Sequence, residues 1–127
     1  MNANEFIDIM DKIYFIDEEN PLNIKMIYVD DNKMRSWDDN IKAAEKMNLL
    51  DYTDWKVPTI DEYIWILDNV KIQYKIMIIG KYWTCMEREE YDGEGKRTLA
   101  WAVSYNGRSF YEWKKRRMYS LFIRKGK

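Results

Sequence analysis

The sequence predicts an α+β fold of about two to three helices packed on antiparallel sheet and hairpins. Apolar residues recur at helical spacing in the first half of the chain, whereas β-branched and aromatic runs dominate beyond Asn69. The dipeptide Asn106-Gly107 between two such runs is the strongest short-range signal for a hairpin. The length and the absence of a low-complexity linker predict a single domain, residues 1–127.

The N-terminal third predicts a helix and then a strand. Apolar residues within 4–15 lie near helical spacing, which predicts a short helix there. Pro21 ends this part, because proline disfavours helical backbone in the residue before it. The β-rich run that follows predicts a strand over 24–29.

Two capped helices are predicted next. Ser36 and Asp39 bracket the start of the first, and its inner face is expected to hold Trp37, Ile41 and Ala44. Thr59 and Glu62 have the spacing of a capping box, in which the hydroxyl accepts an amide hydrogen bond and the carboxylate reaches back. We therefore expect a helix over 60–68.

The second half of the chain predicts strands. Residues 75–85 form an apolar run that indicates a buried strand. Residues 99–105 and 108–113 flank Asn106-Gly107, and we expect positive φ at both of these turn positions. These segments predict one hairpin.

A second hairpin is predicted around the basic sequence Lys-Lys-Arg-Arg at 114–117. It separates 108–113 from the alternating run 118–124, which ends the domain in a strand. Residues 90–97 contain two glycines and mixed charges, and they predict an exposed loop.

The net charge of -1 conceals an asymmetry between the two halves. Residues 1–70 hold 16 acidic and 7 basic residues, and residues 71–127 hold 6 and 14, which gives -9 and +8. The two halves attract each other in the fold or, alternatively, the asymmetry steers a partner.

The composition excludes most catalytic chemistry. The chain has no histidine, which removes Ser-His and Cys-His pairs, histidine-ligated zinc and the commonest general base. No phosphate-binding glycine loop is present, and residues 30–35 lack the glycine and final glutamate of an EF-hand loop. We expect no catalytic residue, no metal and no cofactor, with a carboxylate-only enzyme as the alternative.

Three features of the sequence predict the cellular compartment. One cysteine, Cys85, allows no internal disulfide and fits a reducing compartment. The N-terminus is acidic and lacks the features of a signal peptide. No run approaches the roughly 18 apolar residues that span a bilayer. The sequence predicts a cytoplasmic protein without membrane contact, and Cys85 as a small buried residue.

The order of the motifs resembles a known family. A helix opening at Ser36-Trp37 is followed by Asp-Tyr-Thr-Asp-Trp-Lys-Val-Pro-Thr-Ile-Asp-Glu-Tyr at 51–63, Lys-Tyr-Trp-Thr-Cys at 81–85 and Ala-Trp-Ala-Val-Ser-Tyr-Asn-Gly at 100–107. With the closing strand at 121–127, this order resembles the bacterial Lcl C-terminal domain family. The resemblance covers 34–125, whereas 1–33, with the first helix and strand, match nothing in that family.

The resemblance implies a C-type-lectin-like fold of two helices packed on irregular antiparallel sheets. It also implies a binding or adhesion module without an established catalytic activity. Its most specific block is a structural motif formed by Asp54, Trp55, Pro58, Thr59 and Glu62. The calcium and sugar pattern of animal lectins is missing, and so are the cysteines of the related formylglycine-generating enzymes.

We expect a non-catalytic, cytosolic protein-binding module. A small chain of this kind suggests a phage or mobile-element inhibitor of a host defence nuclease, similar in role to anti-CRISPR proteins, acting in the host cytoplasm. Aromatic residues and arginines are favoured at interface hot spots, and a basic turn projects into solvent. The expected partner-binding residues are Arg108, Tyr111, Trp113, Lys114, Lys115, Arg116 and Arg117.

Two other functions stay open. RNA binding would use the same basic C-terminal hairpin, because lysine and arginine neutralise phosphates and aromatic rings stack on bases. A carbohydrate-binding or adhesion module would use Trp83, Trp101 and Tyr105 to stack on sugar rings, although alternation along strands also favours the core for these residues. In a further alternative, Trp113 packs in the core and the basic turn only keeps the protein soluble.

Overall fold

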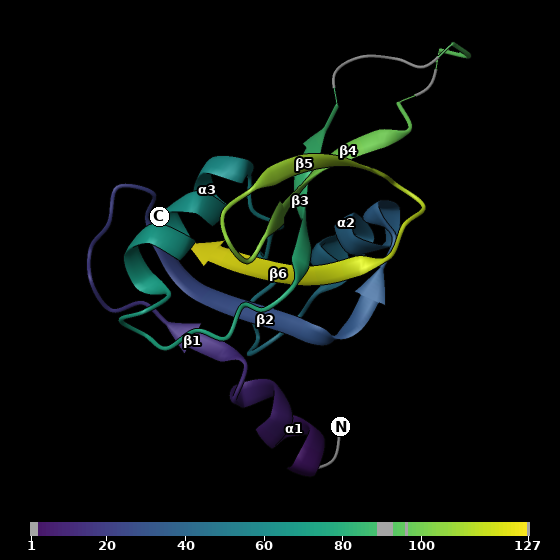
Figure 1. Ribbon diagram of the computed structural model, residues 1–127. Helices are drawn as coiled ribbons and strands as arrows, with labels where there is room; N and C mark the ends of the chain where they lie inside the picture. The colour runs from purple at the N-terminus through teal and green to yellow at the C-terminus, as the bar shows by residue number, and fades with distance from the viewer. Residues whose placement is uncertain (1–2, 89–92, 96, 127) are drawn as a thin grey trace.

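The computed structural model describes residues 3–88, 93–95 and 97–126. Within these residues, six strands form one sheet in the order β1-β2-β6-β3-β4-β5 (Figure 1). The strands are β1 (Ile13–Phe15), β2 (Ile24–Arg35), β3 (Lys81–Glu87), β4 (Leu99–Ser104), β5 (Ser109–Trp113) and β6 (Met118–Lys125). The predicted α+β class is confirmed. The sheet is mixed rather than purely antiparallel, because β3 and β6 pair in parallel.

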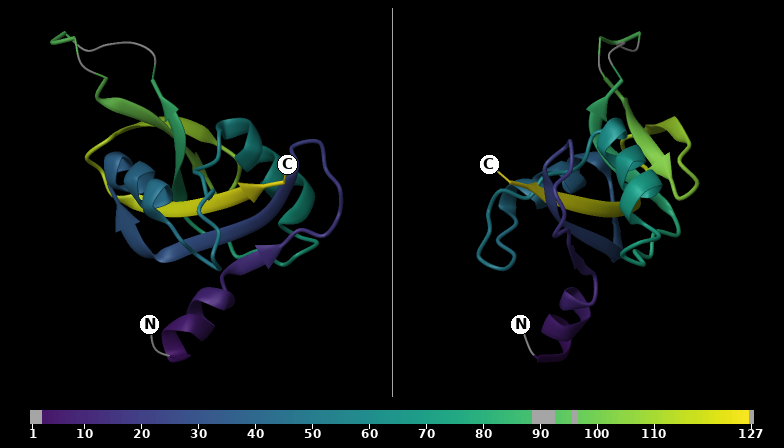
Figure 2. Two further views of the ribbon diagram at one scale, coloured as in Figure 1. Left: turned by 180° about the vertical axis from the view of Figure 1, so that it is seen from behind. Right: turned by 90° about the vertical axis from the view of Figure 1, so that its left-hand side faces the viewer.

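Helical segments cover both faces of the sheet. They are α1 (Ala3–Met10), α2 (Trp37–Lys46), α3 (Ile60–Trp65) and the π-helical turn η1 (Ile66–Val70). β6 is central and buried on both sides: Leu121 and Ile123 pack with α3 and η1, and Phe122 packs with α2. The N-terminal helix α1 projects away from the sheet (Figure 2).

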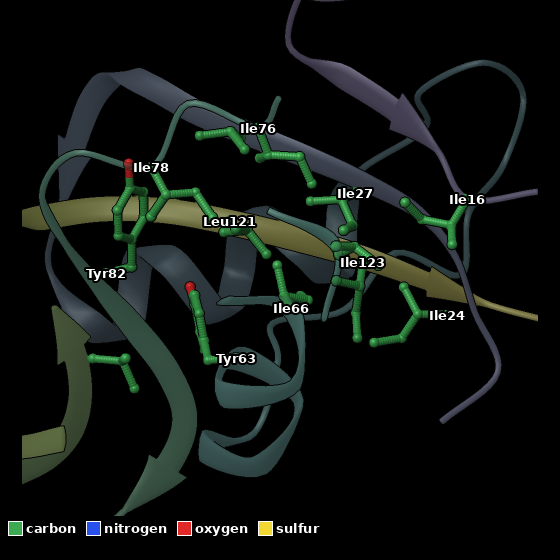
Figure 3. Close-up of a cluster of buried hydrophobic side chains, with 13 residues drawn as sticks. Ile16, Ile24, Ile27, Tyr63, Ile66, Ile76, Ile78, Tyr82, Leu121 and Ile123 are labelled. Atoms are coloured by element: carbon green, nitrogen blue, oxygen red, sulfur yellow. The ribbon is translucent and has the colours of Figure 1, made fainter. Parts of the chain in front are cut away.

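The largest cluster of buried side chains lies between the sheet and α3–η1. Tyr63 and Ile66 from these helices meet Ile27 of β2, Leu121 of β6 and Tyr82 of β3 (Figure 3). The Tyr63 hydroxyl donates a hydrogen bond of 3.0 Å to the carbonyl of Trp83, which satisfies a polar group inside this apolar layer. The core therefore fixes β3 and β6 relative to α3.

Both predicted helix starts are confirmed. Ser36 caps α2 by accepting a hydrogen bond of 3.3 Å from the Asp39 amide. Thr59 and Glu62 form the reciprocal capping box at α3, with hydrogen bonds of 3.2 and 2.9 Å. The helix predicted over 60–68 continues to Val70, and its second half is π-helical.

The N-terminal elements differ from the prediction. The helix expected over 4–15 ends at Met10, and Ile13–Phe15 forms edge strand β1, which pairs with β2. Backbone hydrogen bonds to an available sheet edge outweigh the helical spacing of a few apolar residues. β2 also runs past the expected end at residue 29, and its irregular end is closed by an ion pair of 2.8 Å between Arg35 and Asp30.

The apolar run 75–85 forms a strand only from Lys81 onward. Ile76 and Ile78 are buried in the core, yet their backbone lies outside the sheet. Gly80 separates the two parts, and a Cβ atom there would lie 2.7 Å from the ring of Tyr119. The glycine permits this close approach of the backbone to an aromatic side chain.

The first predicted hairpin is confirmed, but its turn differs. The Gly107 amide donates to the Ser104 carbonyl at 2.9 Å, and the Ser104 amide donates to the Arg108 carbonyl at 2.9 Å. Gly107 has φ +86°, whereas Asn106 is not among the residues with positive φ. The connection is a three-residue loop in which glycine alone takes the left-handed position.

The second predicted hairpin is wrong. β5 pairs only with β4 at the edge of the sheet, and β6 pairs with β2 and β3 in its centre. Residues 114–117 therefore connect an edge strand to a central strand, because β6 is apolar on both faces and needs cover on both.

Of the loop expected over 90–97, residues 93–95 form an exposed turn, while 90–92 and 96 lie outside the described residues.

Candidate functional site

The basic segment 114–117 is anchored at its first residue. The Lys114 amide donates to the Thr98 carbonyl at 3.0 Å, and the Lys114 carbonyl accepts from the Trp37 amide at 2.9 Å. Its ammonium lies 2.6 Å from the Glu87 carboxylate and 4.5 Å from the centre of the Trp37 ring. Lys114 therefore holds the segment against α2 and is not available to a partner.

The next three cations point into different surroundings. Lys115 is exposed and borders a hollow beside Trp113. Arg116 is exposed and lies 3.5 Å from the half-buried Glu112 carboxylate, and a pair with one partner in solvent contributes little stability. Arg117 borders a separate cleft. The four consecutive basic residues thus have one structural member and three outward members.

Aromatic side chains lie on the outer face of β4 and β5 beside this segment. The side chain of Trp113 is 60% exposed. Tyr111 packs on Trp101 with ring centres 3.9 Å apart, and the guanidinium of Arg88 lies 4.6 Å from the centre of the Tyr111 ring. An indole exposed to this extent is unusual for a residue of its size and apolar character, and it marks a candidate contact residue.

The backbone of β5 is closed to strand addition at this end. The Trp113 amide donates to the Glu112 carboxylate at 3.0 Å, and the Trp113 carbonyl accepts from the Arg116 amide at 2.9 Å. Pairing of these groups within the chain is a way of protecting an exposed edge strand. Recognition here would depend on side chains rather than on an added strand.

A hollow of about 290 Å³ lies next to Trp113. It is lined by Asp38, Arg97, Thr98, Trp113, Lys114 and Lys115. The hollow combines an aromatic wall, three cations and a carboxylate, so it can accept an apolar group flanked by charge. We call Tyr111, Trp113, Lys115 and Arg116 the turn surface.

Arg108 does not join the turn surface. It lies at the opposite end of β5, about 17 Å from Trp113 along a strand that rises about 3.3 Å per residue. There it borders a separate hollow of about 440 Å³ with Lys81, Tyr105 and Phe110. The seven predicted partner-binding residues are therefore divided among several surroundings.

A larger cleft of about 490 Å³ was not predicted from the sequence. It is lined by Lys33, Met34, Arg35, Asp39, Lys42, Ala43, Lys46 and Arg117. Most of its cations belong to the half of the chain with net negative charge, which hid them from a count by halves. The available signal was the spacing of Lys42 and Lys46, which places them on one face of the predicted helix.

The motif block around 54–62 is built into the structure. Trp55 is buried, and its indole donates to the Leu49 carbonyl at 3.1 Å. Asp54 accepts two hydrogen bonds from Arg124 at 2.5 and 3.1 Å. The buried carbonyl of Pro58 accepts a hydrogen bond of 3.0 Å from the amide of Cys85. These partners tie the segment to β6 and β3.

Glu62 of the same block is a buried carboxylate held by two lysines. Lys125 lies 2.7 Å and Lys56 3.2 Å from its oxygens. Burial raises the pKa of Glu62, but the hydrogen bonds from Lys125 and the Thr59 amide, together with the charge of Lys56, outweigh burial and hold it below its ordinary value. Glu62 is charged at neutral pH and acts structurally.

The single thiol has no activating surroundings. Cys85 is half-buried, and burial raises its pKa, although the charge of Lys56 opposes this effect. In the described part of the chain, no three carboxylates or thiols lie close enough to hold a metal ion. Because its pKa is raised, the Cys85 thiol is protonated at neutral pH.

Comparisons with known proteins add no family. No protein-family model matches the chain, and no curated protein matches it. The resemblance of residues 34–125 to the Lcl C-terminal domain family stays a prediction. Among the helices in the described residues, none has the length and apolar character needed to cross a membrane.

Proposed function

We propose that the chain is a non-catalytic, cytoplasmic protein-binding module that docks an acidic patch of a partner protein on the turn surface. The observation that carries this proposal is the 60% exposure of Trp113 beside the cations Lys115 and Arg116. Tryptophan, tyrosine and arginine dominate the binding energy of protein interfaces, and basic side chains around them select an acidic partner.

The surroundings of the aromatic rings favour a protein over a nucleic acid. Tyr111 is 42% exposed, but Trp101 packs against its ring and Arg88 lies over it, so contacts within the chain already occupy part of the surface on which a base would stack. Carboxylates of Glu112 and Asp38 lie among the cations, which weakens attraction for a phosphate backbone. A surface that mixes aromatic, basic and acidic side chains is typical of protein interfaces.

The carbohydrate alternative loses its central residue. Trp83 is fully buried, and its indole donates to the Arg35 carbonyl at 2.9 Å, so the ring has no face open to a sugar. Trp101 is half-buried against Tyr111, and Tyr105 lies in the turn at the far end of β5. These three side chains do not form one stacking platform.

The finer predictions on fold and origin belong to the same proposal. A C-type-lectin-like fold is supported by the packing of α2 and α3 on irregular strands, and by the pairing of β2 with the C-terminal strand β6. An inhibitor of a host defence nuclease, encoded by a phage or mobile element, remains the role that we propose for such a module. Such an inhibitor would act in the host cytoplasm, where the free thiol of Cys85 is stable.

The test compares matched variants as baits in lysate of the native host. Trp113→Ala and Lys115→Glu each change one residue of the turn surface. The controls Tyr105→Ala and Arg108→Gln change exposed residues of similar type at the other end of β5. We expect one protein to bind wild type and both controls, and to bind Trp113→Ala at least about tenfold more weakly once purified.

Three outcomes would overturn the proposal. Binding of the captured protein to Trp113→Ala as tightly as to wild type would move the interface elsewhere. Release of the captured material by nuclease would identify a nucleic acid as the ligand. Capture of no protein by the wild-type bait above an empty resin would remove the basis for a protein partner.

A further inference from the structure

The cleft beside α2 has three walls from separate parts of the chain. One face of α2 contributes Lys42 and Lys46, and the irregular end of β2 contributes Lys33 and Arg35. The segment that precedes β6 contributes Arg117. The volume of about 490 Å³ lies within the range of small-molecule sites, roughly 300 to 1,000 Å³. The cleft is therefore large enough for a compact ligand.

Its charge is strongly unbalanced. Five cations and one carboxylate, that of Asp39, line the cleft. Arg35 is already paired with Asp30 at 2.8 Å. Within the described residues, the other four cations form no ion pair with a carboxylate. Like charges gathered in a concave surface raise the local potential, and an anion between them relieves their repulsion.

One wall is held in place by partly buried hydrogen bonds. The guanidinium of Arg35 donates to Asp30 and, at 3.2 Å, to the hydroxyl of Ser120. The Arg35 carbonyl accepts the indole hydrogen bond of buried Trp83. A ligand that enters the cleft meets a preformed wall, so less ordering is needed on binding.

The lining indicates the chemistry of the ligand. Lysines are point charges that suit phosphate oxygens, and the fork of Arg117 can bind a phosphate through two hydrogen bonds. The described residues that line the cleft include no aromatic side chain, so they offer nothing on which a nucleobase could stack. The ligand is expected to present several closely spaced negative charges and to be read through them alone.

We propose that this cleft binds the polyphosphate group of a small molecule, with Lys33, Lys42, Lys46 and Arg117 as its ligands. The site is distinct from the turn surface, because Trp113 and Lys115 border a different hollow. Linked phosphates carry enough charge in a small volume to contact lysines on both sides of the cleft. A free polyphosphate and a nucleoside triphosphate share this group.

The experiment is a calorimetric titration of the full chain with tripolyphosphate at low salt. We expect saturable binding with one ligand per chain. The double change Lys42→Gln with Lys46→Gln is expected to weaken it at least about tenfold, because one hydrogen bond to a charged group contributes about that factor or more. Both lysines are exposed, so the variant is expected to fold, and its thermal unfolding checks this.

A second variant uses an arginine pair as its control. Arg117→Gln removes a guanidinium that lines the cleft, whereas Arg108→Gln makes the same change at the distant end of β5. We expect about tenfold weaker binding for Arg117→Gln and binding within about twofold of wild type for Arg108→Gln. Equal loss in both variants would indicate a general effect of net charge and would overturn the site.

Further ligands separate the sources of the phosphate group. ATP that binds as tightly as tripolyphosphate supports a nucleotide source, and ATP that binds much more weakly supports a free polyphosphate. Single-stranded RNA that binds far more tightly than either, with the same loss in the Lys42 and Lys46 variant, would overturn a small-molecule site.

The two proposals fail separately. Trp113→Ala is expected to leave tripolyphosphate binding unchanged, because Trp113 does not border the cleft. Absence of tripolyphosphate binding by the wild-type chain would overturn the phosphate site while leaving the protein-binding proposal intact.

Discussion

The block at 54–62 and the turn surface both combine a tryptophan with charged residues, yet the fold uses them in opposite ways. Trp55 is 4% exposed and Trp113 is 60% exposed. Glu62 in the block is buried between two lysines, whereas Lys115 at the turn surface is exposed to solvent. The comparison teaches that a tryptophan within a motif can serve the packing of the fold, while the candidate for recognition is the region whose tryptophan stays exposed.

The largest expected effect comes from removing the two indoles. Trp55→Ala removes a buried ring that packs on Tyr28 and a hydrogen bond to Leu49, so we expect a loss of about 3–5 kcal/mol of unfolding free energy. Trp113→Ala is expected to cost less than about 1 kcal/mol, because most of the ring already contacts water. Urea unfolding of both variants measures the difference, and equal costs would show that Trp113 belongs to the core.

The sequence anticipated what depends on local chemistry. The capping box of Thr59 and Glu62 and the cap at Ser36 involve residues three apart, so their spacing alone determines the hydrogen bonds. The hairpin around Gly107 was found for the same reason, although glycine alone takes positive φ there.

The rest depends on contacts between distant segments. The pairing of β6 between β2 and β3 decides that residues 114–117 are not a hairpin, and no local pattern carries that information. The strand at Ile13–Phe15 exists because β2 offers it an edge. The cleft brings Arg117 together with lysines of α2 and β2 that lie more than 70 residues earlier in the chain. No local sequence pattern indicates that these residues share one cleft.

The buried carboxylate gives the second comparison. Glu62→Gln keeps a side chain able to complete the capping box but removes the charge between Lys56 and Lys125, and we expect a loss of about 1–2 kcal/mol at neutral pH after allowing for the partial exposure of both lysines. Glu112→Gln, whose partner Arg116 is exposed at 3.5 Å, is expected to cost about 0–1 kcal/mol.

The stability difference between wild type and Glu62→Gln is expected to depend on pH. Because the pKa of Glu62 lies below its ordinary value of 4.5, its charge stabilises the fold above about pH 4.5, and this contribution is lost as the pH falls through the folded-state pKa. The stability gap between wild type and Glu62→Gln should therefore close in acid. A gap that stays constant from neutral pH down to about pH 2 would show that the lost stability is packing rather than charge.

The smallest expected loss of stability comes from removing the N-terminal caps of α2 and α3. Thr59→Ala removes one arm of a reciprocal capping box and is expected to cost about 1 kcal/mol. Ser36→Ala removes a single hydrogen bond of 3.3 Å at α2, whose first amide is already held at 2.9 Å by the Lys114 carbonyl, so we expect a smaller loss of about 0.5 kcal/mol. Thermal and urea unfolding measure the loss of stability in each of the two variants. A larger cost at Ser36 would mean that α2 depends on its cap more than on the anchored basic segment, and neither change should alter binding at the turn surface.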